Sequence, residues 1–174
     1  MNKPSSHDFQ IAKESVYDYL ELECSELLAE SESAEYLASR VVINNLSVIF
    51  RAAKITPKKT GQFVTLWKRN SSGITEPFHY DDAFDLIIIS VRNGDELGQF
   101  VLPKSVLLEK GIISGSQKEG KRGIRVYPAW DKPTNAQAAK TQKWQLDYFL
   151  EINTPNPAMI NLAKSLFADP ASKA

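Results

Sequence analysis

The chain has 174 residues, of which 43% are hydrophobic and 24% charged, and its formal net charge at pH 7 is zero. This composition predicts one soluble globular domain, residues 1–174, and the longest apolar run, residues 86–89, is far shorter than the roughly 20 residues of a membrane span. One cysteine and two histidines exclude an internal disulfide and disfavour a metal site built on these residues. Because the first ten residues show no signal sequence, we expect a cytoplasmic protein with no membrane partner.

The N-terminal part of the chain predicts a helix followed by a hairpin. Apolar residues such as Phe9, Val16 and Leu27 recur at helical spacing, which predicts an acidic helix over residues 8–30. The segments LASRVVI and LSVIFRAAKI then flank Asn44 and Asn45, a pattern typical of two β-strands joined by a tight turn.

Two later stretches begin with the same four residues, GQFV. GQFVTLWKR (61–69) alternates between two faces and predicts one strand, and GQFVLPK (98–104) predicts a second. The second stretch closes another hairpin, FDLIIISVRNGDELGQFVLP, whose four-residue apolar run predicts a central strand that is buried on both faces. We expect both GQFV strands to lie in one sheet.

The remaining elements complete the predicted fold. Helices are expected over residues 134–151 and 156–168, after a basic sheet body that spans residues 36–130. The fold class is therefore α/β (α+β), with one domain whose mixed, mostly antiparallel sheet is flanked by helices.

Four separated segments carry a family resemblance: FRAAKITPKKTGQFVTLWKR, GQFVLPK, GKRGIRVYPAW and KTQKWQLDYF. Together, and in this order, they resemble the MepB-like family of bacterial proteins over roughly residues 35–149. The resemblance implies a restriction-endonuclease-like fold, in which a mixed sheet lies between helices as in the PD-(D/E)xK nucleases. It implies no particular activity.

Nucleases of that type need an acid on one strand and an acid-x-lysine on the next, where the carboxylates hold Mg²⁺. The second hairpin offers Asp85 and Lys104, but the position of the second acid is Leu102, which cannot bind a metal. Gln99 would replace a carboxylate only weakly. Asp85, Gln99 and Lys104 are therefore weak catalytic candidates, and no metal or other cofactor is expected unless the chain is an active nuclease that uses magnesium.

Charge is distributed unevenly along the chain. Residues 1–36 carry two basic and nine acidic side chains, whereas residues 37–145 carry seventeen basic and nine acidic ones. A basic body favours a polyanionic partner, DNA or RNA, unless the acidic helix lies on it and neutralises it. In the basic stretch, Arg51 and Lys54 are expected on a strand that pairs with the strand of Lys68 and Arg69.

Aromatic and amide residues lie among these charges. Trp67 is either a core residue or a platform on which unpaired bases stack. The loop GSQKEGKRG adds a pair of basic residues flanked by glycines. The residues predicted to contact nucleic acid are Arg51, Lys54, Lys58, Lys59, Gln62, Trp67, Lys68, Arg69, Lys104, Lys121, Arg122, Arg125, Trp130, Gln142, Trp144 and Gln145. Neither a Walker loop nor a GxGxxG motif occurs, which disfavours a nucleotide cofactor.

The leading hypothesis is a nucleic-acid-binding domain with a degraded nuclease-type metal site. One alternative is an active Mg²⁺-dependent nuclease, and another is a non-enzymatic protein-interaction or regulatory protein whose acids cover its basic body. These hypotheses predict different geometry: either the basic residues form one open face, or each is paired with an Asp or Glu.

Overall fold

One sheet of six strands runs through the computed structural model, which describes residues 6–169. The strand order is β1-β2-β3-β8-β9-β11, and only β3 and β8 are parallel neighbours. The strands are β1 (Leu28–Ala29), β2 (Ser39–Ile43), β3 (Leu46–Ala52), β8 (Leu86–Asn93), β9 (Glu96–Pro103) and β11 (Phe149–Glu151). The predicted mixed and mostly antiparallel sheet is confirmed, and β8 is a central strand as expected.

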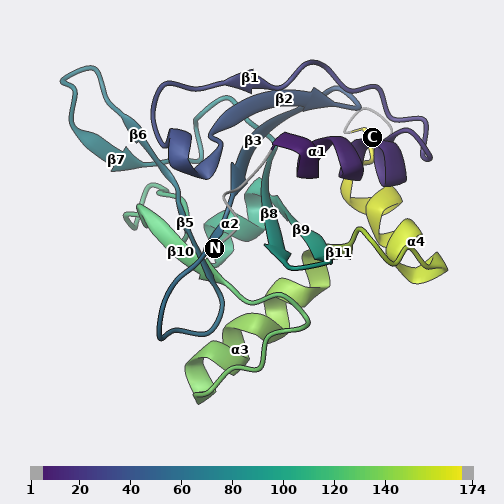
Figure 1. The fold of residues 1–174 in the computed structure, drawn as a ribbon. Coiled ribbons are helices and arrows are strands. Elements are labelled where there is room, and N and C mark those ends of the chain that lie inside the picture. Colours follow the sequence, from purple (N-terminus) through teal and green to yellow (C-terminus); the bar gives the residue numbers. More distant parts are fainter. Residues whose placement is uncertain (1–5, 170–174) are drawn as a thin grey trace.

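Two smaller sheets accompany it. One has the order β10-β5-β4, from β10 (Gly123–Val126), β5 (Gln62–Thr65) and β4 (Lys54–Ile55). The other is the hairpin of β6 (Trp67–Arg69) and β7 (Thr75–Pro77), which extends away from the body of the molecule (Figure 1). The helical segments are α1 (Ser6–Ala12), η1 (Lys13–Tyr17), η2 (Ala34–Tyr36), α2 (Lys104–Glu109), α3 (Ala136–Gln145), η3 (Leu146–Tyr148) and α4 (Pro157–Leu166).

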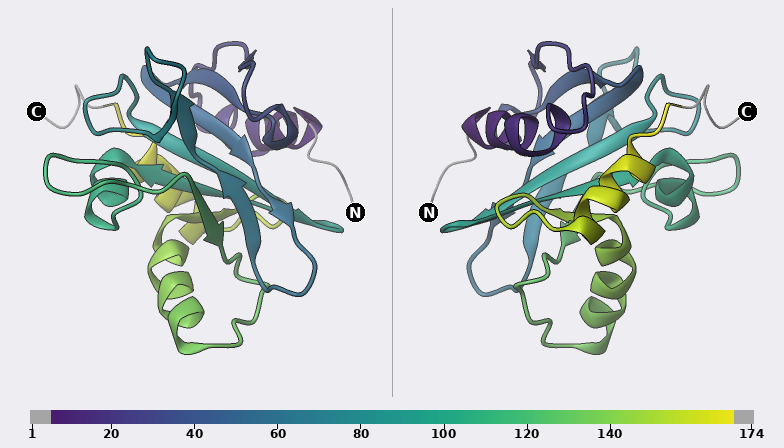
Figure 2. Two further views of the ribbon diagram at one scale, coloured as in Figure 1. Left: turned by 90° about the vertical axis from the view of Figure 1, so that its left-hand side faces the viewer. Right: turned by 90° about the vertical axis from the view of Figure 1, so that its right-hand side faces the viewer.

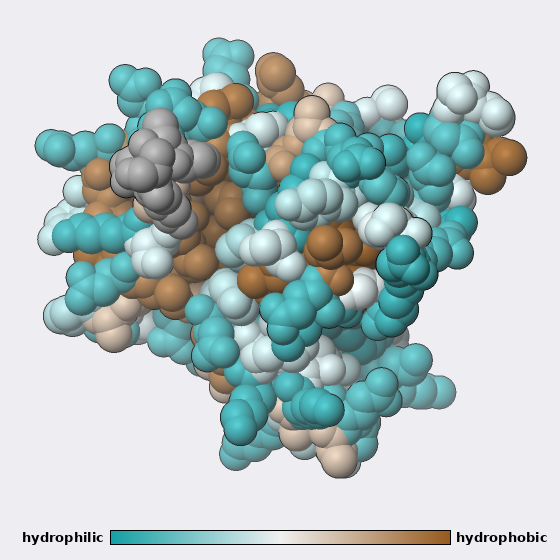
Figure 3. All heavy atoms as spheres, turned by 180° about the vertical axis from the view of Figure 1, so that it is seen from behind, coloured by the Kyte–Doolittle hydropathy of each residue, from teal (hydrophilic) through white to brown (hydrophobic). Residues whose placement is uncertain are grey.

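Each face of the six-stranded sheet has its own hydrophobic core. The first core joins Val48, Ile88 and Val101 to α1 and α4, and the second joins Ile49, Ile87 and Leu102 to α2, β5 and β10. In the side views α1 and α3 accordingly lie on opposite sides of the sheet (Figure 2). Seen from behind, the largest area of hydrophobic residues lies on the side of α4 (Figure 3).

The hairpin of β2 and β3 forms as predicted. Asn44 and Asn45 have φ of 50° and 65°, the left-handed conformation that a two-residue hairpin turn requires and that asparagine tolerates. The Asn44 side chain also donates to the Phe167 carbonyl at 2.7 Å, which ties the turn to the end of α4.

The helix predicted over residues 8–30 is shorter than expected. It ends at Tyr17, and the chain reverses at Glu21, whose φ is 57°. Beyond that point the backbone follows the edge of β2, with Ser25 N bonded to Val42 O at 2.9 Å and Glu30 N to Ala38 O at 2.7 Å. The helical spacing was overridden because the edge of β2 needs backbone partners. In the same way, the end of the helix predicted over 134–151 forms η3 and β11.

The two GQFV segments do not share a sheet, so this expectation was wrong. GQFVTLWKR divides at Leu66 into β5 and β6, and GQFVLPK belongs to β9. A Cβ would clash at both glycines, with the Tyr127 ring at Gly61 and with the Phe149 ring at Gly98, and Gly61 in addition has φ of 81°. The shared letters therefore serve two unrelated environments.

Residues 1–5 and 170–174 lie outside the described residues. The N-terminal segment that was expected to lack a signal sequence lies partly there, as do both ends of the predicted domain. Between residues 6 and 169, no helix has the length and apolar character needed to cross a membrane.

Candidate nucleic-acid interface

Arg51, the first residue of the predicted basic cluster, lies inside the protein. Its side chain is 1% exposed, its Nη2 atom is 3.6 Å from Glu30 Oε2, and its guanidinium lies 5.7 Å from the centre of the Phe78 ring. Burial lowers the pKa of Arg51, and the charge of Glu30 opposes this shift. Arg51 therefore has no part in a surface that meets nucleic acid.

Lys54 and Arg69 are paired with acids from the segment that follows β1. Lys54 Nζ is 3.6 Å from Glu35 Oε2 and 4.7 Å from the centre of the Tyr36 ring, and Arg69 Nε donates to Glu32. The predicted pairing forms only in part: β4, which carries Lys54, pairs with β5, the first half of the strand predicted over residues 61–69. The strands of Arg51 and Lys68 do not pair, because β3 pairs with β2 and β8 while β6 pairs with β7. The basic cluster of residues 51–69 is thus divided among several environments.

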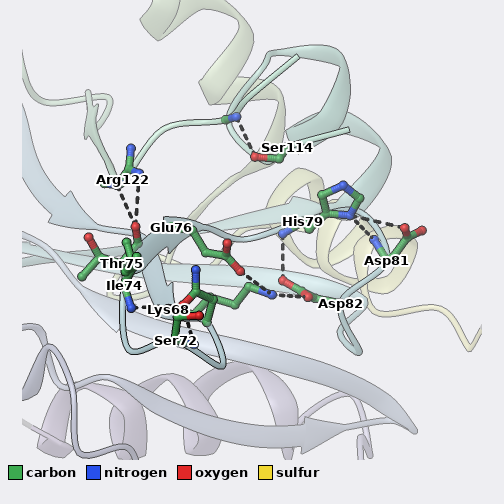
Figure 4. A network of polar contacts seen from close by, with 12 residues as sticks. Lys68, Ser72, Ile74, Thr75, Glu76, His79, Asp81, Asp82, Ser114 and Arg122 are labelled. Carbon is green, nitrogen blue, oxygen red and sulfur yellow. Dashed lines mark hydrogen bonds and ion pairs between the residues drawn. The ribbon is translucent and has the colours of Figure 1, made fainter. Parts of the chain in front are cut away.

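Lys68 is held between two carboxylates. Its Nζ lies 2.6 Å from Asp82 Oδ1 and 3.5 Å from Glu76 Oε1 (Figure 4). Burial acts to raise the pKa of Asp82, but the hydrogen bonds from Lys68 and from the His79 amide outweigh it and hold this pKa below its ordinary value. The network joins β6 and β7 to the loop after β7 and neutralises Lys68.

Gln62 is not free for a ligand, whereas Trp67, Lys58 and Lys59 are at least partly exposed. Gln62 is buried and donates to the Arg92 carbonyl at 3.1 Å, and Trp67 is half-buried, with the Arg69 guanidinium 5.4 Å from its ring centre. Lys58 and Lys59 are exposed in the turn before β5, where they form no ion pair with any residue between 6 and 169.

The nuclease-type positions do not fit a magnesium site. The Asp85 carboxylate accepts the backbone N–H of Ser47 at 2.8 Å, Leu102 is fully buried, and Lys104 Nζ donates to the Asp82 carbonyl. Gln99 accepts the Tyr17 hydroxyl and pairs with Ser90, which lies roughly 16 Å along the strand from Asp85 at about 3.3 Å per residue. In the described part of the chain, no three His, Cys, Asp or Glu residues form a group that could hold a metal ion.

A groove brings four of the remaining predicted residues together. It lies between β10, α3 and the segment after α2, and its volume is about 410 Å³, within the range of ligand sites. Four of the predicted residues line it, namely Lys121, Arg125, Trp144 and Gln145, together with Lys110, Ile112, Gly123, Ile124, Tyr127, Asn135, Gln137, Ala138 and Thr141.

Two glutamines of α3 fasten this helix beside the groove: Gln145, which lines it, and Gln142, which does not. Gln145 accepts the Tyr127 N–H at 2.9 Å and donates to the Arg125 carbonyl at 3.0 Å, so both ends of its buried amide are satisfied. Gln142 donates to the carbonyls of Pro128 and Asp131 at 2.9 Å each. Both residues therefore hold α3 against the chain around β10. The buried Gln145 amide is satisfied at both ends, whereas the Gln142 Oε1 atom accepts no hydrogen bond within the described residues.

The charged residues that line the groove are all basic. Lys110, Lys121 and Arg125 line it, and no Asp or Glu is among the lining residues, although Lys110 Nζ lies 3.6 Å from Glu109 Oε1 beside the groove. Lys121 forms no ion pair within residues 6–169, and Arg125 donates to the carbonyls of Thr60 and Gly61 rather than to an acid. A concave surface lined by one sign of charge concentrates counter-ions, so this groove attracts anions.

Arg122 and Trp130 lie outside the groove lining. Arg122 is exposed and donates to the Thr75 carbonyl at 3.1 Å (Figure 4). It also lies 3.3 Å from Glu119. Trp130 packs on the Phe149 ring, with ring centres 5.7 Å apart. Trp130 is thus a core residue in the main, and Arg122 supports the loop that carries Lys121.

The sequence analysis missed Lys110, Tyr127 and Gln137. Lys110 Nζ lies 5.4 Å from the centre of the Trp144 ring, although 34 positions separate the two residues along the chain. No spacing rule connects them, since the contact depends on how α2 and α3 pack. Thr141 was detectable, because it lies three residues from Trp144 on the same helical stripe.

The comparisons with known proteins identify the family of this chain. The family model described as MepB-like matches residues 30–151, and the chain belongs to this family.

The crystal structure of MepB is 34% identical, with a TM-score of 0.73, and the match covers 76% of this chain and 89% of that one. The bacterial homing endonuclease I-Ssp6803I matches at 15% identity and a TM-score of 0.49, over 81% of this chain and 88% of that chain. No match is found among the curated proteins.

Proposed function

We propose that this MepB-like protein binds DNA or RNA through the groove between β10, α3 and the segment after α2. The observation that carries the proposal is the convergence of Lys110, Lys121 and Arg125 on a hollow of about 410 Å³ whose lining contains no carboxylate. A nucleic acid presents regularly spaced phosphates that such basic side chains bind, and each contact releases counter-ions from the nucleic acid. A nucleic-acid partner agrees with the cytoplasmic location expected from the sequence.

The proposal includes a degraded nuclease-type metal site. Two residues support this part of the proposal. The Asp85 carboxylate already accepts the Ser47 N–H, and the buried Leu102 occupies the position where a second acid is needed. We therefore expect binding without cleavage, in the presence or absence of Mg²⁺. Magnesium-dependent cleavage that disappears in Asp85→Asn would favour the active nuclease instead.

The first prediction concerns the salt dependence of binding. Binding of the full chain to labelled DNA and RNA should weaken steeply as salt rises, and Lys121→Gln should reduce the slope of log K against log salt by about 0.7–0.9. Lys164→Gln makes the same charge change at an exposed position of α4, so it is the matched control and should leave the slope unchanged. Fluorescence anisotropy at several salt concentrations measures both slopes.

A second candidate function, in protein interaction or regulation, is favoured by the ion pairs of Arg51, Lys54 and Arg69 with Glu30, Glu35 and Glu32. These pairs neutralise much of the basic body internally. Absence of binding to any nucleic acid at low salt would overturn the nucleic-acid proposal and leave this one.

A further inference from the structure

We infer that the groove is specific for unpaired nucleotides, with one base held against Trp144 and its phosphates on Lys121 and Arg125. The inference rests on the proposed function and adds the class of nucleic acid.

The groove contains an aromatic face. Trp144 is partly exposed, and it packs against the second core on one side while lining the groove on the other. The ammonium group of Lys110 lies 5.4 Å from the centre of its ring, a cation–π contact at a place where a base would stack. Lys110 Nζ also lies 3.6 Å from Glu109 Oε1, and a phosphate that enters the groove and draws Lys110 away from the ring leaves the ring face for a base.

The groove also contains polar groups that the fold does not use. Gln137 and Thr141 line it from α3, and their side chains form no hydrogen bond within the described residues. Gln145, by contrast, is fully engaged with Tyr127 and Arg125. The free amide and hydroxyl can form hydrogen bonds with the edge of a nucleobase while the aromatic ring stacks on its face.

These features favour a single strand over a duplex. In a duplex the faces of the bases are stacked and only their edges are open in the grooves, so a ring inside a hollow has nothing to stack on. An unpaired nucleotide exposes base and phosphate together, and a volume of about 410 Å³ suits a unit of that size.

The experiment compares three probes of equal length: an oligothymidine, the same backbone without bases, and a hairpin duplex. The wild-type chain should bind the oligothymidine about tenfold more tightly than either of the others, since stacking of one base typically contributes that much. Trp144→Leu should remove this difference and leave affinity for the abasic strand and the duplex within twofold. Trp67→Leu, a tryptophan outside the groove, should change none of the three affinities.

The outcomes separate the inference from the function on which it rests. Equal binding of the three probes by the wild-type chain overturns the single-strand inference and leaves nucleic-acid binding intact, and this result needs no variant. An equal loss for all three probes in a folded Trp144→Leu protein also overturns it. Absence of binding to any probe at low salt overturns the proposed function itself.

Discussion

The pair of Arg51 and Glu30 shows how single residues of the basic body are neutralised. Glu30 accepts from Arg40 Nε at 2.9 Å and lies 3.6 Å from Arg51, whose Nε atom is buried without a hydrogen-bond partner. A buried guanidinium is costly unless a charge of opposite sign compensates it. Glu30 is therefore a structural residue, although it lies in a segment that is acidic and largely exposed.

Replacing Glu30 should consequently destabilise the fold. We expect Glu30→Gln to lower the free energy of unfolding by about 2 kcal/mol, because it leaves the buried Arg51 charge without its acid. Glu26→Gln, at an exposed acid nearby, should have almost no effect. Urea unfolding of both variants measures the difference. Adding Arg51→Met to Glu30→Gln should restore much of the loss, and a double variant less stable than Glu30→Gln would contradict this account.

At the scale of elements, the hairpin of β6 and β7 is fastened by ion pairs. Lys68 binds Asp82 in the loop after β7, and Arg69 binds Glu32 in the segment after β1. The hairpin adds no residue to the second core beyond Leu66 and Phe78 at its two ends. Its position therefore depends on charged contacts more than on apolar burial, and it should respond to pH.

The pH dependence follows from the lowered pKa of Asp82. Burial acts against the charged form, but Lys68 and the His79 amide bind the carboxylate, so its pKa in the folded protein lies below that in the unfolded chain. The stability that Asp82 contributes is then present above its unfolded pKa of about 4 and is lost as pH falls through the folded value. Asp82→Asn should reduce stability at pH 7 by about 1 kcal/mol, and the difference from wild type should shrink below about pH 4. Urea unfolding at both pH values tests this, and a difference that grows in acid would contradict it.

At the scale of the whole molecule, two cores share one sheet. The strands β3, β8 and β9 contribute alternate residues to both cores, so neither core persists without the sheet. Trp130 and Trp144 pack against the second core, and Cys24 packs against the first. The two tryptophans therefore report on the second core, and the Cys24 thiol reports on the first.

The shared sheet predicts a single cooperative unfolding transition, as expected of one domain. Tryptophan fluorescence and the labelling of Cys24 by a thiol reagent should show the same midpoint in urea, with far-ultraviolet circular dichroism as a third probe. Separate midpoints for Cys24 and for the tryptophans would mean that the two layers unfold independently, and the prediction of one domain would then be wrong.

The sequence by itself determined the elements with strong local signals. The paired asparagines at 44 and 45 specified a hairpin turn, the apolar run of β8 specified a central strand, and four family segments specified the MepB-like fold. These features depend on neighbouring residues, whose spacing is visible in the chain.

Only the tertiary structure decided which charges are free. Arg51 and Lys121 look alike in a list of basic residues, yet one is buried beside Glu30 and the other lines a groove without acids. Lys110 and Trp144 meet because α2 and α3 both pack on the second core. The acids after β1 reach the basic body because that segment follows the edge of β2. Coulomb interactions act through space over several ångströms and are indifferent to chain order, so the pairing of charges is fixed only when the chain has folded.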